Sequence, residues 1–463
     1  MVNQLHTIKD RVVKAEKADA KLPRVTAKGG LAAAQALARR QGLWNIVKTC
    51  FPARKDATRG FQTEACVSSL VFGLLSGGKG FSATEPMRGD DPLLRTLGQD
   101  AAPSAETIEE VVKYVALEKD GCTFANAALR RQAAWTLGRM KTSDLKSCGG
   151  FVPVWADGSV LEVEGKCFDA IKFIKGKRGQ VCAGAFCGPV MTGMDFAAEG
   201  EGELTVSRRL IAAAVQEVLR PLRLMEQTLI LLDSLYGNDP ALAQLESYRE
   251  KPAYIVGLMG LVEAERVMRE LPEIVWRDTG AQPSRKWDAS GVAQAWVQCK
   301  DWPEKRPMVC RRWREESEMI WNYAAVTTCL TADDPRVFKH MRDHQLGFEE
   351  TIWDLYSHKQ AMENQWKELL SDMRLHHPPC AKAKVNAVFY AIAGLAYNLA
   401  VGLKKLALEC ASRCMRLWRL RREVFDLAAC AAHHGRQVVV RFLDARDYLI
   451  DQLLAAMGRI ARL

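Results

Sequence analysis

Two aspartates each follow a short apolar segment that is typical of a buried strand. Asp157 comes directly after VPVWA at 152–156, and Asp233 comes directly after TLILL at 228–232. A glycine follows each aspartate within four residues, which predicts a turn at each strand end. Open α/β sheets bind ligands at the carboxyl ends of their strands. Either aspartate alone is more simply a turn cap, but the pair could hold a divalent cation through hard oxygen ligands.

A third acid belongs to a different kind of pattern. Tyr356, Lys359 and Glu363 are separated by three and four positions, so on a helix they share one face. That face would carry a phenol and a cation, which can hold a phosphate, and a carboxylate, which can complete a metal site. Solvated helix faces carry such triplets too, and the spacing alone leaves both interpretations open.

The segments that must position these residues alternate between strand and helix. Residues 1–148 are mostly helical by apolar periodicity, with Gly149 and Gly150 as a linker. Residues 149–269 then show strands and helices in the order of a mixed α/β sheet. The further strands are expected at 160–163, as a hairpin partner of the first, and at 181–186, 190–196 and 253–257; the helices are expected at 207–219 and 241–249.

Residues 270–328 form a tryptophan-rich segment with short strand-like pieces, predicted to be a small β-rich insertion. Six of the 12 tryptophans fall here: Trp276, Trp287, Trp296, Trp302, Trp313 and Trp321. Most are expected in the insertion's own core, and Trp302 is the candidate for stacking on a nucleic-acid base. The chain from residue 334 onward is predicted to be helical, in two parts, 329–403 and a basic region 404–463.

The charge is concentrated at the two ends of the chain. Residues 1–60 hold 13 Lys and Arg against 4 Asp and Glu, and residues 374–463 hold 15 against 6. The net charge of the whole chain is +10, so the middle carries a net charge of −8. Basic ends around a carboxylate-bearing centre favour a polyanion partner, with solvated helix surfaces as the simpler alternative. A basic turn with Lys175, Lys177 and Arg178 could likewise follow DNA phosphates or be a plain hairpin.

Composition excludes several other classes of protein. A hydrophobic fraction of 48% and a charged fraction of 26% are ordinary for a globular chain and exclude a disordered or collagen-like one. The 14 cysteines show no CxxC pair, so we expect reduced thiols rather than zinc sites or a disulfide framework. Residues 1–28 lack the apolar region of a secretory signal. The 19 uncharged residues at 385–403 approach the length of a membrane span, but Asn386 and Asn398 favour a buried core helix.

Together the three acidic motifs resemble the DDE transposases of bacterial insertion sequences, the group with a Y-x2-R-x3-E-x6-K signature. The first motif is WADGSVL at 155–161 and the second is LDSLYGN at 232–238. The third is YSHKQAMEN at 356–364, and the similarity continues through 386–399 and into the N-terminal region. The resemblance therefore extends over nearly the whole chain.

The resemblance implies a fold, an activity and a set of partners. The fold is an RNase H-like mixed-sheet core, interrupted by the β-rich insertion and flanked by helical N- and C-terminal regions. Asp157, Asp233 and Glu363 would hold two Mg²⁺ or Mn²⁺ ions for DNA cleavage and strand transfer. Tyr356, Lys359 and Lys367 would contact phosphates. The partners would be double-stranded element ends and target DNA, bound by a homodimer without a membrane, in the cytoplasm and nucleoid of a bacterium.

The chain departs from the signature at two positions. Lys359 stands where the family has arginine, which keeps the charge but loses the bidentate fork. Leu370 stands at the lysine position, with Lys367 one turn earlier as a substitute. These departures keep open a domesticated transposase that binds DNA without cutting it. An RNase H-like nuclease without end specificity is a further alternative.

Overall fold

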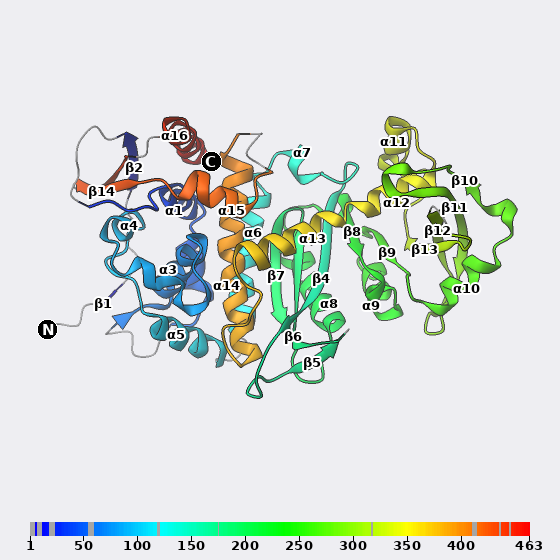
Figure 1. The fold of residues 1–463 in the computed structure, drawn as a ribbon, viewed down its shortest axis with the longest axis horizontal. Helices are drawn as coiled ribbons and strands as arrows, with labels where there is room; N and C mark the ends of the chain where they lie inside the picture. Colours follow the sequence, from blue (N-terminus) through cyan, green and yellow to red (C-terminus); the bar gives the residue numbers. More distant parts are fainter. Residues whose placement is uncertain are drawn as a thin grey trace.

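In the computed structural model, helices form one end of the molecule, and a mixed sheet runs from the middle to the other end (Figure 1). This arrangement confirms the mixed α/β class. The structure describes residues 5–6, 12–17, 24–53, 60–117, 121–174, 176–315, 318–409, 414–434, 437–443 and 446–463. Lys175 lies outside the described residues.

Ten strands of the described chain form one sheet, in the order β10-β11-β12-β13-β9-β8-β4-β6-β5, with β7 also paired to β6. β4, β8 and β9 are parallel, and their apolar sequences suit burial on both faces. The remaining pairs are antiparallel. The bounds are β4 Val152–Glu162, β5 Ile171–Ile174, β6 Lys177–Cys187, β7 Val190–Phe196, β8 Thr228–Leu232, β9 Ala253–Gly257, β10 Arg277–Asp278, β11 Trp287–Val297, β12 Arg306–Glu315 and β13 Asn322–Thr328.

β4 corrects one prediction from the sequence. Asp157 and Gly158 were expected in a hairpin turn between two strands, but both lie inside one continuous strand. The reason is β6, which pairs with β4 from Val154 to Glu162 and so satisfies its backbone through the glycine. Asp157 therefore sits in mid-strand, at the level where the parallel pairing with β8 stops.

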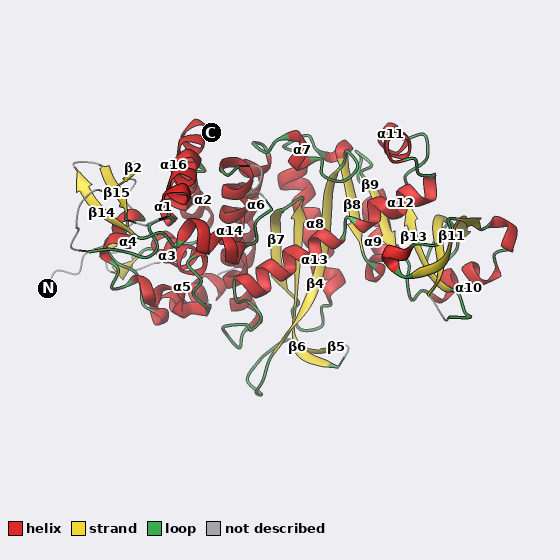
Figure 2. Cartoon of the chain, turned by 45° about the horizontal axis from the view of Figure 1, so that its top comes forward, coloured by secondary structure: helices red, strands yellow, loops and turns green. Residues whose placement is uncertain are grey.

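The tryptophan-rich segment has the expected strands, but they extend the main sheet instead of forming a separate one. β13 pairs with β9 through Val326–Gly257 to Thr328–Ile255, and β12 and β11 follow as a meander. The sheet thus carries the central strands and the segment at 270–328 as one continuous surface. Figure 2 shows these strands in line with the central ones.

The helices pack in two groups. α1 to α6 and α14 form the helical end, while α12 and α13 cross one face of the sheet toward it (Figures 1 and 2). The bounds are α1 Leu31–Arg40, α2 Leu43–Cys50, α3 Thr63–Leu75, α4 Asp91–Thr96, α5 Ala105–Leu117, α6 Gly121–Leu137, α7 Thr142–Leu145, α8 Glu203–Ala214, α9 Asp239–Glu246, α10 Val262–Glu270, α11 Pro335–His344, α12 Phe348–Ser357, α13 Gln360–Lys367, α14 Ala383–Gly402, α15 Leu417–Leu420 and α16 Asp447–Arg462.

α14 is the long apolar helix predicted at 385–403. With the turn that follows it, 383–407 is long and apolar enough to cross a membrane, yet its most apolar 18-residue window is entirely buried inside the protein. Asn398 donates to the Met191 carbonyl oxygen at 2.8 Å and accepts from the Met191 N–H at 2.8 Å, which fixes the helix against β7. The prediction of a buried core helix is confirmed.

The two basic ends of the chain meet in the structure. β2, at Val12–Lys17, is parallel to β15, at Gln437–Phe442, which in turn pairs with β14, at Ala429–His434. The prediction of helix throughout the C-terminal region is wrong here. The valine-rich run of β15 favours a strand, and its partner β2 comes from the other end of the sequence. The described parts of the two ends are therefore joined by this three-stranded sheet.

Candidate functional site

Parallel pairing of β4 and β8 brings the first two acids together. Trp155 is opposite Leu231 in the register, and two residues further along each strand come Asp157 and Asp233. Because neighbouring strands lie about 4.8 Å apart, the two carboxylates lie side by side at this level of the sheet. The prediction that both acids lie near the same strand edge is met, although β4 itself continues past it.

The effect of Glu363 on the pKa of Asp157 places the third acid close to the first. Burial raises the pKa of the Asp157 carboxyl, the Lys359 ammonium lowers it, and the negative charges of Asp233 and Glu363 raise it again. The Lys359 Nζ lies 3.9 Å from Asp157 Oδ2. Asp157 Oδ1 also accepts from the Gly158 N–H at 2.9 Å. The site is thus a partly buried carboxylate facing two like charges and one cation.

Asp233 is held by the turn that follows β8. Its Oδ1 accepts from the Leu235 N–H at 2.9 Å, which caps a short 3₁₀ turn. The Tyr356 hydroxyl donates to the Leu232 carbonyl oxygen at 3.1 Å. Burial raises the pKa of Tyr356, and Asp233 and Asp157 raise it further. Tyr356 thus ties the end of α12 to the β8 edge as a neutral hydroxyl.

The helix predicted across the third motif is divided. α12 ends at Ser357 and α13 begins at Gln360, although the residues between keep right-handed helical backbone angles. α13 packs on the sheet through Gln365, which accepts from Trp155 Nε1 at 3.0 Å and donates to the Gly188 carbonyl oxygen at 3.1 Å. The Glu363 carboxylate is exposed and accepts a hydrogen bond from Gln360.

The chemistry of the three carboxylates fits a divalent cation, but the side chains are not arranged around a common point. Three carboxylates supply the hard oxygens that Mg²⁺ and Mn²⁺ prefer. Two of them leave adjacent strands, and like charges raise the pKa of Asp157. Even so, in the part of the chain that the structure describes, no three His, Cys, Asp or Glu side chains are arranged as a metal-binding group. Glu363, turned to Gln360, is the most exposed of the three.

Sequence reasoning missed a fourth acid, which approaches the same strand from the opposite face. Alternate residues of a strand point to opposite faces, so Gly158 faces α8 when Asp157 faces α13. A Cβ at residue 158 would lie 2.4 Å from Glu203 Cδ, so a larger residue there would require the Glu203 side chain to move. Burial raises the pKa of Tyr236, and then Glu203, Asp157 and Asp233 raise it too. No motif marks Glu203, because it starts a helix far along the chain.

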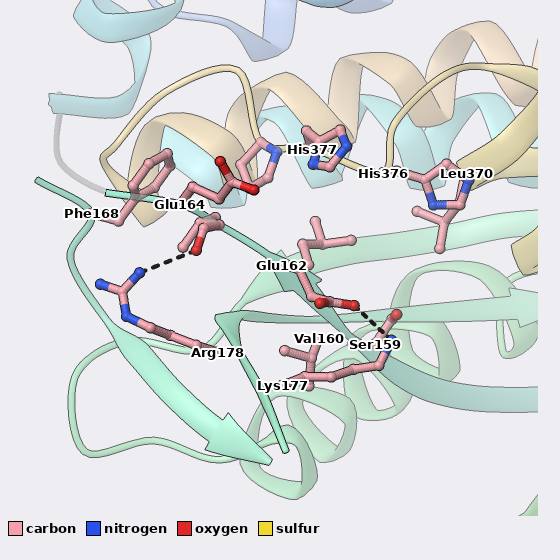
Figure 3. A pocket seen from close by; sticks show the side chains of 13 residues that line it. Ser159, Val160, Glu162, Glu164, Phe168, Lys177, Arg178, Leu370, His376 and His377 are labelled. Atoms are coloured by element: carbon pink, nitrogen blue, oxygen red, sulfur yellow. Dashed lines mark hydrogen bonds and ion pairs between the residues drawn. The ribbon is translucent and has the colours of Figure 1, made fainter. Parts of the chain in front are cut away.

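The predicted phosphate contacts Lys177 and Arg178 line a groove of about 960 Å³ beyond Asp157 on β4 (Figure 3). Lys177 forms an ion pair with Glu162 at 2.7 Å, and Arg178 donates to the Val163 carbonyl oxygen at 3.1 Å. Leu370, at the signature lysine position, lines the same groove. The groove therefore joins the basic hairpin to the chain segment that follows α13.

Two other predicted DNA contacts, Lys367 and Trp302, do not line this groove. Lys367 is exposed in the last turn of α13. Trp302 is only 4% exposed, and the Arg306 guanidinium lies 4.8 Å from its ring. Trp302 thus belongs to the core at the outer end of the sheet and presents no free face on which a base could stack.

Comparisons with known proteins identify the family. A family model described as Transposase DDE domain group 1 matches residues 202–463, which include Asp233 and Glu363. A solved structure of piggyBac transposase in a synaptic complex with hairpin DNA aligns over 87% of this chain and 81% of that chain, with 14% identity and a TM-score of 0.33. No curated protein matches. Since the family model covers more than half of the chain, the protein belongs to the DDE transposases of domain group 1.

Proposed function

We propose that this protein is a DNA transposase that cleaves element ends and joins them to a target at Asp157, Asp233 and Glu363. The observation that carries the proposal is the register of β4 and β8, which sets two acids of a DDE-family chain side by side. The proposed core is RNase H-like, and it is supported by a mixed sheet with one acid on β4, one directly after the parallel strand β8, and a third on a helix across the sheet.

The proposed chemistry needs no covalent link between protein and DNA. Asp157, Asp233 and, after its side chain turns from Gln360, Glu363 would hold two Mg²⁺ or Mn²⁺ ions. Bound there, the ions would activate a water or a DNA 3′-hydroxyl and stabilise the leaving oxygen. Lys359 would neutralise and orient the scissile phosphate, and Tyr356 would hold the strand edge that carries Asp233.

The proposed partners follow from the charge and the family. Double-stranded DNA would be the substrate, with the joined basic ends of the chain and the groove at Lys177 and Arg178 as contact surfaces. Two element ends must be brought together, so a homodimer on DNA is proposed. A bacterial cytoplasm with the nucleoid is the proposed location. Addition of Mg²⁺ to the protein with a plasmid carrying its gene's flanking DNA tests cleavage, and cleavage that needs no divalent ion would contradict this site.

A non-cleaving, DNA-binding descendant of a transposase is the second candidate. One specific observation favours it. The Lys359 ammonium lies 3.9 Å from Asp157 Oδ2, so it already supplies the positive charge that a metal ion would supply in a cleaving enzyme. DNA binding with no cleavage in either Mg²⁺ or Mn²⁺ would select this candidate.

Replacement of Lys359 tests the proposed phosphate contact. Lys359→Ala is expected to cost about 1.5–3 kcal/mol in cleavage, the range for a hydrogen bond to a charged group. Lys359→Arg is expected to keep or raise activity, because a guanidinium offers two parallel donors to phosphate. The measurement is the single-turnover cleavage rate in Mg²⁺, with the exposed Lys339→Ala on α11 as a matched control. Wild-type cleavage by Lys359→Ala would show that this lysine contacts no reacting phosphate.

A further inference from the structure

Two consecutive arginines of β12 face opposite sides of the sheet and differ in their partners. Arg312 forms an ion pair with Glu273, donating to its Oε2 at 2.7 Å, and lies over Trp276 and Trp321. Its charge is therefore neutralised. Arg311 points to the other face of the strand, as alternation along a strand requires.

Arg311 is surrounded by aromatic rings instead of carboxylates. Its Cζ lies 4.1 Å from the Trp353 ring centroid, 4.8 Å from that of Trp287 and 5.4 Å from that of Trp313. In the described chain, its buried Nε has no hydrogen-bond partner, and neither does the buried Trp353 Nε1. Two N–H donors are thus left unsatisfied at one place. The buried Nε of Arg312 also lacks a partner, but Arg312 uses its terminal nitrogens on Glu273.

The surrounding charge does not compensate for this burial. Burial, and to a smaller extent the positive charge of Arg285, lower the pKa of Arg311 to about 10. Arg285 itself is exposed, and its Cζ lies 5.0 Å from the Trp287 ring centroid. Cation–π contacts hold the guanidinium plane, yet they do not use its N–H donors. A planar fork of free donors next to a second arginine is suited to a phosphate.

This arginine group is linked to the acid site through two aromatic side chains of α12. Trp353 lies on α12, and its ring is 5.9 Å from the ring of Tyr356, which bonds the strand edge before Asp233. Figure 1 shows α12 beside β11 to β13 and leading into α13. Phosphates recur about every 3.4 Å of axis along each DNA strand. β12 is the third strand from β8 in the sheet, about 14 Å away at the usual strand spacing. A DNA strand that runs from the acids across α12 would therefore bring a phosphate only a few nucleotides away to β12.

We propose that Arg311 and Arg285 bind a backbone phosphate of the DNA strand that enters the acid site. This inference rests on the proposed function and adds a contact outside the three DDE motifs. The ligand is the phosphodiester group, so the contact would serve any DNA sequence and would set the position of the strand, not its recognition.

The test compares full-length variants in binding a fluorescein-labelled 40-base-pair duplex of arbitrary sequence over a KCl series. Arg311→Met keeps the apolar bulk among the rings and removes the charge, while Arg285→Ala changes an exposed side chain. Arg314→Ala is the matched control, because Arg314 lies over Trp321 on the opposite face.

Arg311→Met is expected to weaken binding about 10- to 100-fold. It should also reduce the slope of log K against log salt by about 0.9. Arg285→Ala should change the affinity and the salt slope in the same direction, and Arg314→Ala should change neither of them.

Each outcome has a defined meaning. If wild type binds the duplex and both Arg311→Met and Arg285→Ala keep its affinity and slope, the inference is overturned while the proposed function stands. If wild type binds no duplex at any salt, the proposed function fails first and this contact with it. If thermal melts show that Arg311→Met is unfolded, Arg285→Ala decides alone. Saturable quenching of tryptophan fluorescence by inorganic phosphate, lost in Arg311→Met, would indicate a small-anion site and would also overturn the strand contact.

Discussion

Asp157→Asn is expected to reduce metal-dependent DNA cleavage by about 100- to 1,000-fold, the loss typical for one group that stabilises charge in a transition state. The carboxylate is one of two that leave adjacent parallel strands, and an amide oxygen cannot replace its charge at a divalent ion. The measurement is the initial cleavage rate of a plasmid bearing the gene's flanking DNA in Mg²⁺. Glu265→Gln, an exposed acid on α10, is the matched control and should cleave as wild type does.

The same substitution is expected to stabilise the metal-free protein at neutral pH. The pKa of Asp157 is raised above its ordinary value of 3.8 in the fold, mainly by burial. A raised pKa means that its favourable contribution to folding exists at low pH and is lost as pH rises through the folded-state pKa. At pH 7 the ionised side chain is therefore a cost that asparagine removes. A melting temperature lower than that of wild type at pH 7, or a gain that persists at pH 3, would contradict this interpretation of the site.

Divalent ions are expected to raise the melting temperature of the wild-type chain in the absence of DNA. An ion that binds only the folded state at 100 times its dissociation constant stabilises by about 2.7 kcal/mol. Mn²⁺ and Mg²⁺ should each have this effect, and EDTA should reverse it. Asp233→Asn should abolish most of the shift, because in the proposed site this carboxylate would share the ion with Asp157.

Glu363→Gln separates two versions of the metal site in the same melts. If the exposed Glu363 side chain turns from Gln360 to join the ions, its loss should reduce the shift as well. If the shift in Glu363→Gln equals that of wild type, Glu363 does not bind the ions without DNA. Equal shifts in wild type and in Asp233→Asn would mean that the ions bind elsewhere. Ca²⁺ in place of Mg²⁺ serves as a control for binding without catalysis.

The sequence was most informative where the signal was local. Apolar runs before Asp157 and Asp233 predicted β4 and β8, because strands buried on both faces lack polar positions. The absence of charge between residues 385 and 403, with two asparagines inside it, predicted a buried helix. Three- and four-residue spacing predicted helix around Tyr356 and Glu363, and both lie on helices, although the helix is divided between them. In each case, neighbouring residues alone determined the outcome.

Long-range pairing accounts for the errors. The turn expected at Gly158 is part of a strand because β6 pairs with β4 across it. The tryptophan-rich segment joins the main sheet because β13 pairs with β9. β15 forms on β2, whose residues lie more than 400 positions earlier. Glu203 and Arg311 belong to no motif, because only the packing of α8 on β4 brings Glu203 beside Gly158, and only the packing of α12 on the sheet brings Trp353 against Arg311.

The central claim, that Asp157, Asp233 and Glu363 act as one cleavage site, is tested most directly by single-turnover cleavage of the flanking-DNA plasmid in Mg²⁺. The variants are Asp157→Asn, Asp233→Asn, Glu363→Gln and the triple substitution, each with DNA binding measured alongside. Residues that act as a unit show strongly non-additive losses. We therefore expect every single variant to fall to nearly the rate of the triple variant while still binding DNA. Wild-type cleavage by any one of the three single variants would contradict the three-acid site.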